Sequence, residues 1–235
     1  MEITTWSPAP IEGDGKASKD ELLVTFDQSR AVRVLVIPAL FDEANKLRRF
    51  TLTIMRALDE AGIDSALPDW PGCNESVVSL SKQSLETWQA AAKQVCKAFG
   101  ATHVLSLRGG VLVAPSDLPG WRYAPVEGAK LLSGMLRAET IAAREGGRGE
   151  TREDLMERGR EHGLTLAGWE FGPQMLRDLE TDGLEGPTAL ETIDQSEIGG
   201  AGLWLRAEPD EDAEQAARLA TLIIESLATP DEVAS

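Results

Sequence analysis

Hydrophobic and polar positions alternate in blocks that predict strands separated by helices over the first half of the chain. Residues 32–37 form a short β-branched run that ends at Pro38, as expected of a strand buried on both faces. Over 85–99 apolar side chains recur at steps of three and four, the spacing of one helix face, and Gly100 supplies a stop. The predicted order is strand, helix, strand, helix, strand, over 32–37, 45–61, 64–68, 85–99 and 102–107. This alternation predicts an α/β fold with a mostly parallel sheet flanked by helices.

The remaining segments are less regular, but they complete a single α/β domain over residues 1–235. We expect further strands at 22–26, 121–125, 188–193 and 203–205, and further helices at 127–144, 151–162, 171–179 and 210–227. Residues 127–180 are interpreted as a small helical cap, inserted over the carboxyl edge of the sheet. Open α/β sheets bind their ligands at that edge, so the cap is expected to cover a binding crevice.

Composition and charge exclude several classes of protein. Hydrophobic residues make up 42 % of the 235 residues, enough for a buried core, and 39 acidic against 23 basic residues give a net charge of −16. So acidic a surface repels nucleic acid and anionic lipid. No apolar run approaches the roughly 20 residues of a membrane helix, and the start lacks the features of a secretory signal. We therefore expect a cytoplasmic protein without membrane insertion.

The most informative stretch is Leu-Ser-Leu-Arg-Gly-Gly-Val at 105–111, where a strand runs into a glycine pair and an apolar helix start. The nucleophile elbow, G-x-S-x-G, occupies such a strand-to-helix turn. Aligned on that pattern, Ser106 and Gly110 flank the turn and Arg108 takes the place of the nucleophile. A guanidinium stays protonated at neutral pH, so it cannot attack a carbonyl carbon.

The other catalytic residue types do not restore hydrolysis by a Ser-His-Asp triad. The order in such enzymes is nucleophile, acid and then a late histidine, but the histidines are His103 and His162, and none follows residue 205. Ser106 is a weak candidate for a displaced nucleophile and Glu43 for a carboxylate that activates water. Cys73 and Cys96 form neither a disulfide framework nor zinc-ligand spacing. We expect no metal and no cofactor.

Several strings point to one family. They are Pro38, Glu-Ala-Asn-Lys-Leu-Arg-Arg at 43–49, Asp-Trp-Pro-Gly-Cys-Asn-Glu-Ser at 69–76, the elbow at 105–110, Pro-Val-Glu-Gly at 125–128, Leu-Arg at 136–137 and Ala-Gly-Trp at 167–169. In these the chain resembles the α/β-hydrolase-like proteins encoded beside exosortase A in Gram-negative bacteria, especially the group called exosortase A system-associated hydrolase 2. The resemblance implies an α/β-hydrolase fold with arginine at the elbow, in a pseudoenzyme or a weakly active member of that group.

Two interpretations of Arg108 stay open. It could bind a carboxylate or phosphate of a small anionic or acyl ligand, or form a structural salt bridge to a neighbouring loop, with Glu43 as the partner. The residues expected around such a ligand are Arg108, Gly109, Glu43, Asn45, Lys46, Arg49, Trp70 and Ser76. Lys46 and Arg49 equally suit the solvated side of a helix, and Ser76 a loop that caps the next helix.

The positions of five tryptophans have two interpretations. Five indoles are candidates for an apolar crevice or for ordinary core positions: Trp70, Trp88, Trp121, Trp169 and Trp204.

Three functions are compatible with the sequence. They are a non-hydrolytic binding protein, an ester or thioester hydrolase with a non-standard nucleophile or carboxylate-activated water, and an interaction protein of a sorting or secretion system that docks through its cap. A homo-oligomer is compatible with each.

Overall fold

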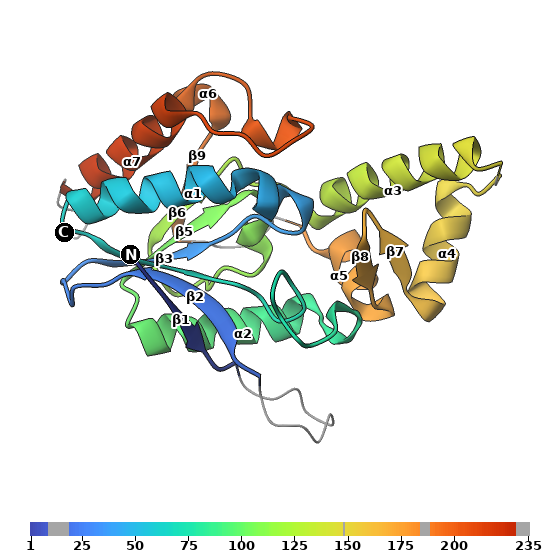
Figure 1. The fold of residues 1–235 in the computed structure, drawn as a ribbon, viewed down its shortest axis with the longest axis horizontal. Helices are drawn as coiled ribbons and strands as arrows, with labels where there is room; N and C mark the ends of the chain where they lie inside the picture. Colours follow the sequence, from blue (N-terminus) through green and yellow to red (C-terminus); the bar gives the residue numbers. More distant parts are fainter. Residues whose placement is uncertain (9–18, 148, 184–188, 229–235) are drawn as a thin grey trace.

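The computed structural model of the chain describes residues 1–8, 19–147, 149–183 and 189–228, and its centre is a seven-stranded sheet (Figure 1). The strand order is β1-β2-β4-β3-β5-β6-β9. The strands are β1 (Glu2–Trp6), β2 (Glu21–Phe26), β3 (Arg33–Ile37), β4 (Asp64–Pro68), β5 (His103–Leu107), β6 (Gly120–Tyr123) and β9 (Leu190–Ile193). β2 is antiparallel to both β1 and β4, and the other pairs are parallel. The predicted mostly parallel sheet is confirmed.

Helices cover both faces of this sheet. α1 (Asp42–Glu60) and α7 (Ala213–Ala228) pack together on one face, and α2 (Leu85–Phe99) lies on the other (Figure 1). Along β3, Val34 and Val36 face the core under α1, whereas Leu35 and Ile37 face the core on the α2 side. This alternation explains why the strand is an uninterrupted apolar run. None of the helices in the described ranges is long and apolar enough to cross a bilayer.

A group of elements at residues 128–181, which we call the cap, lies beyond the carboxyl ends of the parallel strands (Figure 1). It consists of α3 (Gly128–Glu145), α4 (Arg152–His162), the hairpin β7 (Leu164–Leu166) and β8 (Trp169–Phe171), and α5 (Pro173–Thr181). Buried side chains of the cap, including Leu132, Phe171 and Met175, join the core on the α2 face. The cap is therefore packed onto the sheet by a continuous apolar interior.

Three local predictions differ from the structure. Leu203–Leu205 forms a 3-10 turn, η3, rather than a strand. The expected helix after β5 is only a 3-10 turn, η2 (Arg108–Leu112), because two adjacent glycines disfavour an α-helix. The helix expected at 171–179 begins at Pro173, since Phe171 ends β8. β1, the β7–β8 hairpin and the short helix α6 (Gln195–Ile198) were not predicted from the sequence.

Candidate functional site

The turn after β5 has the backbone of a tight elbow. Arg108, the first residue beyond the strand, has φ +52°, in the left-handed region that residues with a Cβ seldom adopt. Gly110 makes the turn feasible: a Cβ there would lie 2.4 Å from the Pro38 carbonyl oxygen and 2.9 Å from that of Ile37. The close approach of two neighbouring strand ends thus requires a glycine at this position.

The Arg108 side chain is enclosed by three segments of the chain. Its Nε and Nη2 each donate to a carboxylate oxygen of Glu43 at 3.0 Å, and Nη1 donates to the Ala124 carbonyl oxygen at 2.8 Å. The guanidinium carbon lies 3.9 Å from the centre of a Trp204 ring. Only 10 % of the side chain is exposed. Of the two interpretations of Arg108, the salt bridge to Glu43 describes the observed geometry.

Apolar side chains pack beside the elbow. A Cβ on Gly109 would lie 2.4 Å from Leu131 Cδ1, in the cap, and 3.5 Å from Leu40 Cγ, in the loop after β3. In enzymes with a nucleophile elbow, the residue after the nucleophile and this same loop supply the oxyanion hole. Leu131 and Leu40 therefore both lie close to Gly109. The shortened turn η2 also means that no α-helix begins at the elbow, so no α-helix N-terminus is available there to bind an anion.

The other basic candidates on α1 pair away from the elbow. Lys46 Nζ lies 2.8 Å from Asp42, and Arg49 Nη2 lies 2.8 Å from Glu211 on the exposed side of the helix. Asn45 is exposed. Arg49 thus lies on the solvated helix face, whereas the Lys46 side chain is only 18 % exposed. Ser106, in contrast, is buried within β5, and its hydroxyl donates to the Trp121 carbonyl oxygen at 3.4 Å.

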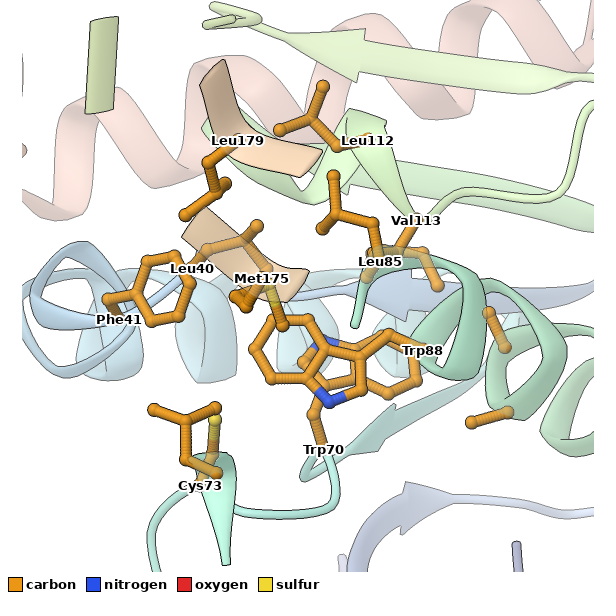
Figure 2. Close-up of a cluster of buried hydrophobic side chains, with 14 of the residues drawn as sticks. Leu40, Phe41, Trp70, Cys73, Leu85, Trp88, Leu112, Val113, Met175 and Leu179 are labelled. Carbon is orange, nitrogen blue, oxygen red and sulfur yellow. The ribbon is translucent and has the colours of Figure 1, made fainter. Parts of the chain in front are cut away.

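A crevice opens between the loop after β3, the loop after β4 and the cap hairpin. Its lining consists of Pro38, Ala39, Leu40, Phe41, Ala44, Arg48, Asp69, Trp70, Cys73, Asn74, Trp88 and Trp169. Trp70 and Trp88 are stacked with ring centres 6.5 Å apart, and Phe41 and Cys73 lie beside them (Figure 2). Three of the five candidate tryptophans thus line the crevice. Trp121 instead stacks on His103, and Trp204 covers Arg108.

The pairing of two polar residues that line the crevice was not predicted from the sequence. Arg48 Nη1 donates to Asp69 Oδ1 at 2.9 Å, and 36 % of the Arg48 side chain is exposed. Both residues belong to the strings 43–49 and 69–76. Their meeting could have been anticipated, because Asp69 follows β4 and α1 follows β3, so both lie at the carboxyl edge of neighbouring parallel strands.

Ser76 has a structural position in the loop after β4. Its Oγ donates to Glu21 Oε1 at 2.8 Å and accepts from the backbone N–H of Gly72 at 2.8 Å and of Val78 at 3.3 Å. Glu21 itself was not anticipated from the sequence. Burial, together with the nearby carboxylates of Asp69 and Asp20, raises the pKa of Glu21 to about 7, although the Ser76 hydrogen bond lowers it.

The described residues contain no group of three or more His, Cys, Asp or Glu side chains that could hold a metal ion. Cys73 and Cys96 are both buried and free. Burial raises the pKa of the Cys73 thiol well above its usual range and that of Cys96 to about 12. Neither thiol is therefore poised as a nucleophile at neutral pH.

Comparison with known proteins identifies the fold. No family model and no curated protein sequence matches the chain. Among solved structures, an AqdC variant, described as recognising and cleaving the ring of the Pseudomonas quinolone signal, superposes with a TM-score of 0.55 at 12 % identity, over 97 % of this chain and 99 % of its own.

Two further solved structures have a similar fold. Est1E from Butyrivibrio proteoclasticus has a TM-score of 0.51 at 12 % identity, over 81 % of this chain and 76 % of its own. Mouse alpha/beta hydrolase domain-containing protein 10 also has a TM-score of 0.51, at 10 % identity, over 77 % and 70 % of the two chains. Together with the mostly parallel sheet flanked by helices, these similarities show that the chain has the α/β-hydrolase fold.

Proposed function

We propose that the chain is a non-hydrolytic α/β-hydrolase-fold protein that binds a small anionic or acyl ligand at the carboxyl edge of its sheet. One observation carries the non-hydrolytic part of this proposal: a guanidinium bound by Glu43 lies at the position that the nucleophile takes in the elbow pattern. Arginine has no lone pair to offer at neutral pH. Leu131 and Leu40, packed against Gly109, further support the loss of acyl-transfer chemistry.

Two cations are candidates for the anionic part of the ligand. In the sequence-based hypothesis Arg108 binds it, and Glu43 then acts as an internal carboxylate that the ligand must displace. Arg48 is the second candidate, because it is partly exposed and lies at the aromatic lining that would receive an acyl chain. Lys46 and Arg49 are less suited, since Lys46 pairs with Asp42 of α1 and Arg49 pairs with Glu211, which precedes α7.

A fluorophosphonate probe and a panel of esters and thioesters test the non-hydrolytic part. We expect no labelling of the wild-type protein and no turnover above that of the Arg108→Ala variant, because labelling requires an activated hydroxyl. Labelling that is lost in Ser106→Ala would overturn this part and favour the alternative of a non-standard nucleophile. Turnover lost in Glu43→Gln would favour carboxylate-activated water.

The ligand part is tested by titrating fatty acyl carboxylates and acyl phosphates by calorimetry into four single variants. Arg108→Ala and Arg48→Ala remove the candidate cations, Arg49→Ala is the matched control on the same helix, and Glu43→Ala removes the internal competitor. If the anion binds Arg108, affinity falls in Arg108→Ala and rises in Glu43→Ala. If it binds Arg48, only Arg48→Ala weakens it. Equal affinity in wild type, Arg108→Ala and Arg48→Ala contradicts the proposed anion role.

The resemblance to the exosortase-associated group suggests that the protein acts beside exopolysaccharide or protein-sorting machinery in a Gram-negative bacterium.

An interaction protein that docks through the cap is the third candidate. Co-purification from cells that carry that machinery distinguishes it: a partner lost when exposed cap residues such as Ile141 are replaced supports docking rather than ligand binding.

A further inference from the structure

Four aromatic side chains form a connected row along the crevice. The ring of Phe41, in the loop after β3, lies 5.7 Å from that of Trp88 in α2 and 5.9 Å from that of Trp169 in the cap hairpin, measured between ring centres. Trp70, in the loop after β4, stacks on Trp88 with ring centres 6.5 Å apart. All four residues line the crevice, and Figure 2 shows Phe41, Trp70 and Trp88 together. The row therefore joins the cap hairpin to the loop after β4.

The other apolar residues of the lining are mostly small. They are Pro38, Ala39, Leu40, Ala44 and Cys73, and among these five Leu40 alone has a branched aliphatic chain. The aromatic rings therefore present the larger apolar side chains to a ligand. The crevice is also narrow, and its space of about 400 Å³ includes open solvent. A flat ring enters such a space edge-on, whereas a saturated ring or a branched chain is thicker.

An aromatic ligand gains affinity from such a lining beyond the burial of apolar area. Each offset-stacked or edge-to-face contact between rings contributes the equivalent of about two- to tenfold in affinity, and a saturated chain cannot make these contacts. Trp169 is the ring that a ligand reaches first, because it is partly exposed. Phe41, Trp70 and Trp88 are at most 3 % exposed. We therefore expect Trp169 to determine how strongly the crevice prefers an aromatic ligand.

Arg48 supplies a positive charge to the same lining. Its side chain is 36 % exposed, and within the described residues its guanidinium makes one hydrogen bond, from Nη1 to Asp69 Oδ1. A guanidinium carries five N–H donors in a planar fork, so Nε and Nη2 remain as a pair of parallel donors. A ligand carboxylate can accept from both of them while the pair with Asp69 stays in place.

We propose that the ligand of the crevice is an aryl carboxylate, with a flat aromatic ring system packed against Trp169 and Phe41 and a carboxylate bound by Arg48. This inference rests on the proposed function, because it names the chemical class of the ligand at the same site. It goes further in two respects: the apolar part of the ligand is aromatic rather than saturated, and the cation that binds its carboxylate is Arg48 rather than Arg108.

Calorimetric titration with 2-naphthoate and with its saturated counterpart, decahydro-2-naphthoate, tests the aromatic part. The saturated acid is the more apolar of the two, so burial of apolar area alone favours it, and a preference for 2-naphthoate reports the ring contacts. We expect the wild type to bind 2-naphthoate about tenfold more tightly. Trp169→Leu should reduce this ratio to about threefold or less, whereas Trp169→Phe, which keeps a ring, should retain most of it. A wild-type ratio near one, or a ratio unchanged in Trp169→Leu, overturns the proposal.

The uncharged amide 2-naphthamide tests the position of the carboxylate. We expect the wild type to bind it at least about tenfold more weakly than 2-naphthoate, because the charge-assisted hydrogen bonds to the guanidinium are lost. In Arg48→Ala the two compounds should bind alike, whereas Arg49→Ala, the matched control on the same helix, should follow the wild type. A preference for 2-naphthoate that persists in Arg48→Ala overturns the assignment of the carboxylate to Arg48.

Failure of this inference can be told apart from failure of the proposed function. If fatty acyl carboxylates bind and neither ring carboxylate does, the aryl class is overturned and the proposed function stands. If no carboxylate of either kind binds, both are overturned.

Discussion

Glu43 and Arg108 face one another across the elbow, and each of the two guanidinium nitrogens nearest the carboxylate lies 3.0 Å from one of its oxygens. This two-point geometry is the strongest form of an arginine–carboxylate pair. Because the two side chains are only 10 % and 16 % exposed, water screens the pair weakly. The pair joins the start of α1 to the end of β5, so it fixes the elbow with respect to the loop after β3.

Glu43→Gln should destabilise the protein by about 2–4 kcal/mol, because it leaves the Arg108 charge buried without a counter-charge. Urea unfolding measures the change. The control is Arg49→Ala, which breaks the exposed pair with Glu211 and should cost less than about 1 kcal/mol. Equal losses in the two variants would contradict a structural role for the buried pair.

Trp204→Ala should cost about 1–3 kcal/mol, since it removes the ring over the Arg108 guanidinium and the edge contact with Tyr123. Leu205→Ala, at the neighbouring residue of η3, is the matched control because its side chain is 75 % exposed. Thermal unfolding of the two variants is the measurement. An unaltered melting temperature for Trp204→Ala would show that the ring contributes nothing to the elbow.

Two glycines should respond to alanine in opposite directions. At Gly110 a Cβ would collide with the backbone oxygen of Pro38, so Gly110→Ala should destabilise the fold by about 2–4 kcal/mol or prevent folding. At Gly134, inside α3, a Cβ would meet no atom within 4 Å, so alanine should stabilise the helix by about 0.5–1 kcal/mol. Chemical denaturation of both variants checks the contrast, and a gain in stability for Gly110→Ala would disprove the close approach.

Stability should depend on pH through Glu21. Its pKa is about 7 in the folded chain, against an ordinary value of 4.5, so the folded state binds this proton more tightly than the unfolded state. The stabilisation of the fold by this proton is therefore full below pH 4.5. About 1–3 kcal/mol of it is lost as the pH rises to 7. Urea midpoints between pH 4.5 and 8 measure it. Glu21→Gln should flatten this part of the profile, and a profile unchanged by the variant would refute the assignment.

Elements with one dominant periodicity could be predicted from the sequence. The β-branched run of β3 predicts a buried strand, and the three- and four-residue apolar steps of α2 predict a helix with one buried face. Both patterns are clear because burial determines which positions of these elements are apolar. β1 gives no such signal, since four of its five residues are exposed. The strands β7 and β8, of three residues each, are too short to show alternation. Leu203–Leu205 is apolar but turns back within one 3-10 turn.

The site was predictable only in part. Glu43 could be named as a partner for Arg108, because the loop after β3 and the end of β5 lie on neighbouring parallel strands. Its other partners could not be foreseen: the Ala124 carbonyl oxygen belongs to the backbone, and Trp204 comes from a turn almost a hundred residues away in the chain. The pair of Arg48 with Asp69 could not be read from the elbow pattern at 105–110, because neither residue belongs to it.

The left-handed backbone at residue 108 has a wider consequence. Such a conformation costs on the order of 1–3 kcal/mol in a residue with a Cβ, yet it persists here around a side chain that cannot react. Gly110 approaches the carbonyl oxygens at the end of β3 too closely for a Cβ, so this turn requires glycine at position 110 whatever side chain residue 108 carries. The turn at residue 108 therefore has a structural role, because its guanidinium contacts Glu43, Ala124 and Trp204, which come from three distant stretches of the chain.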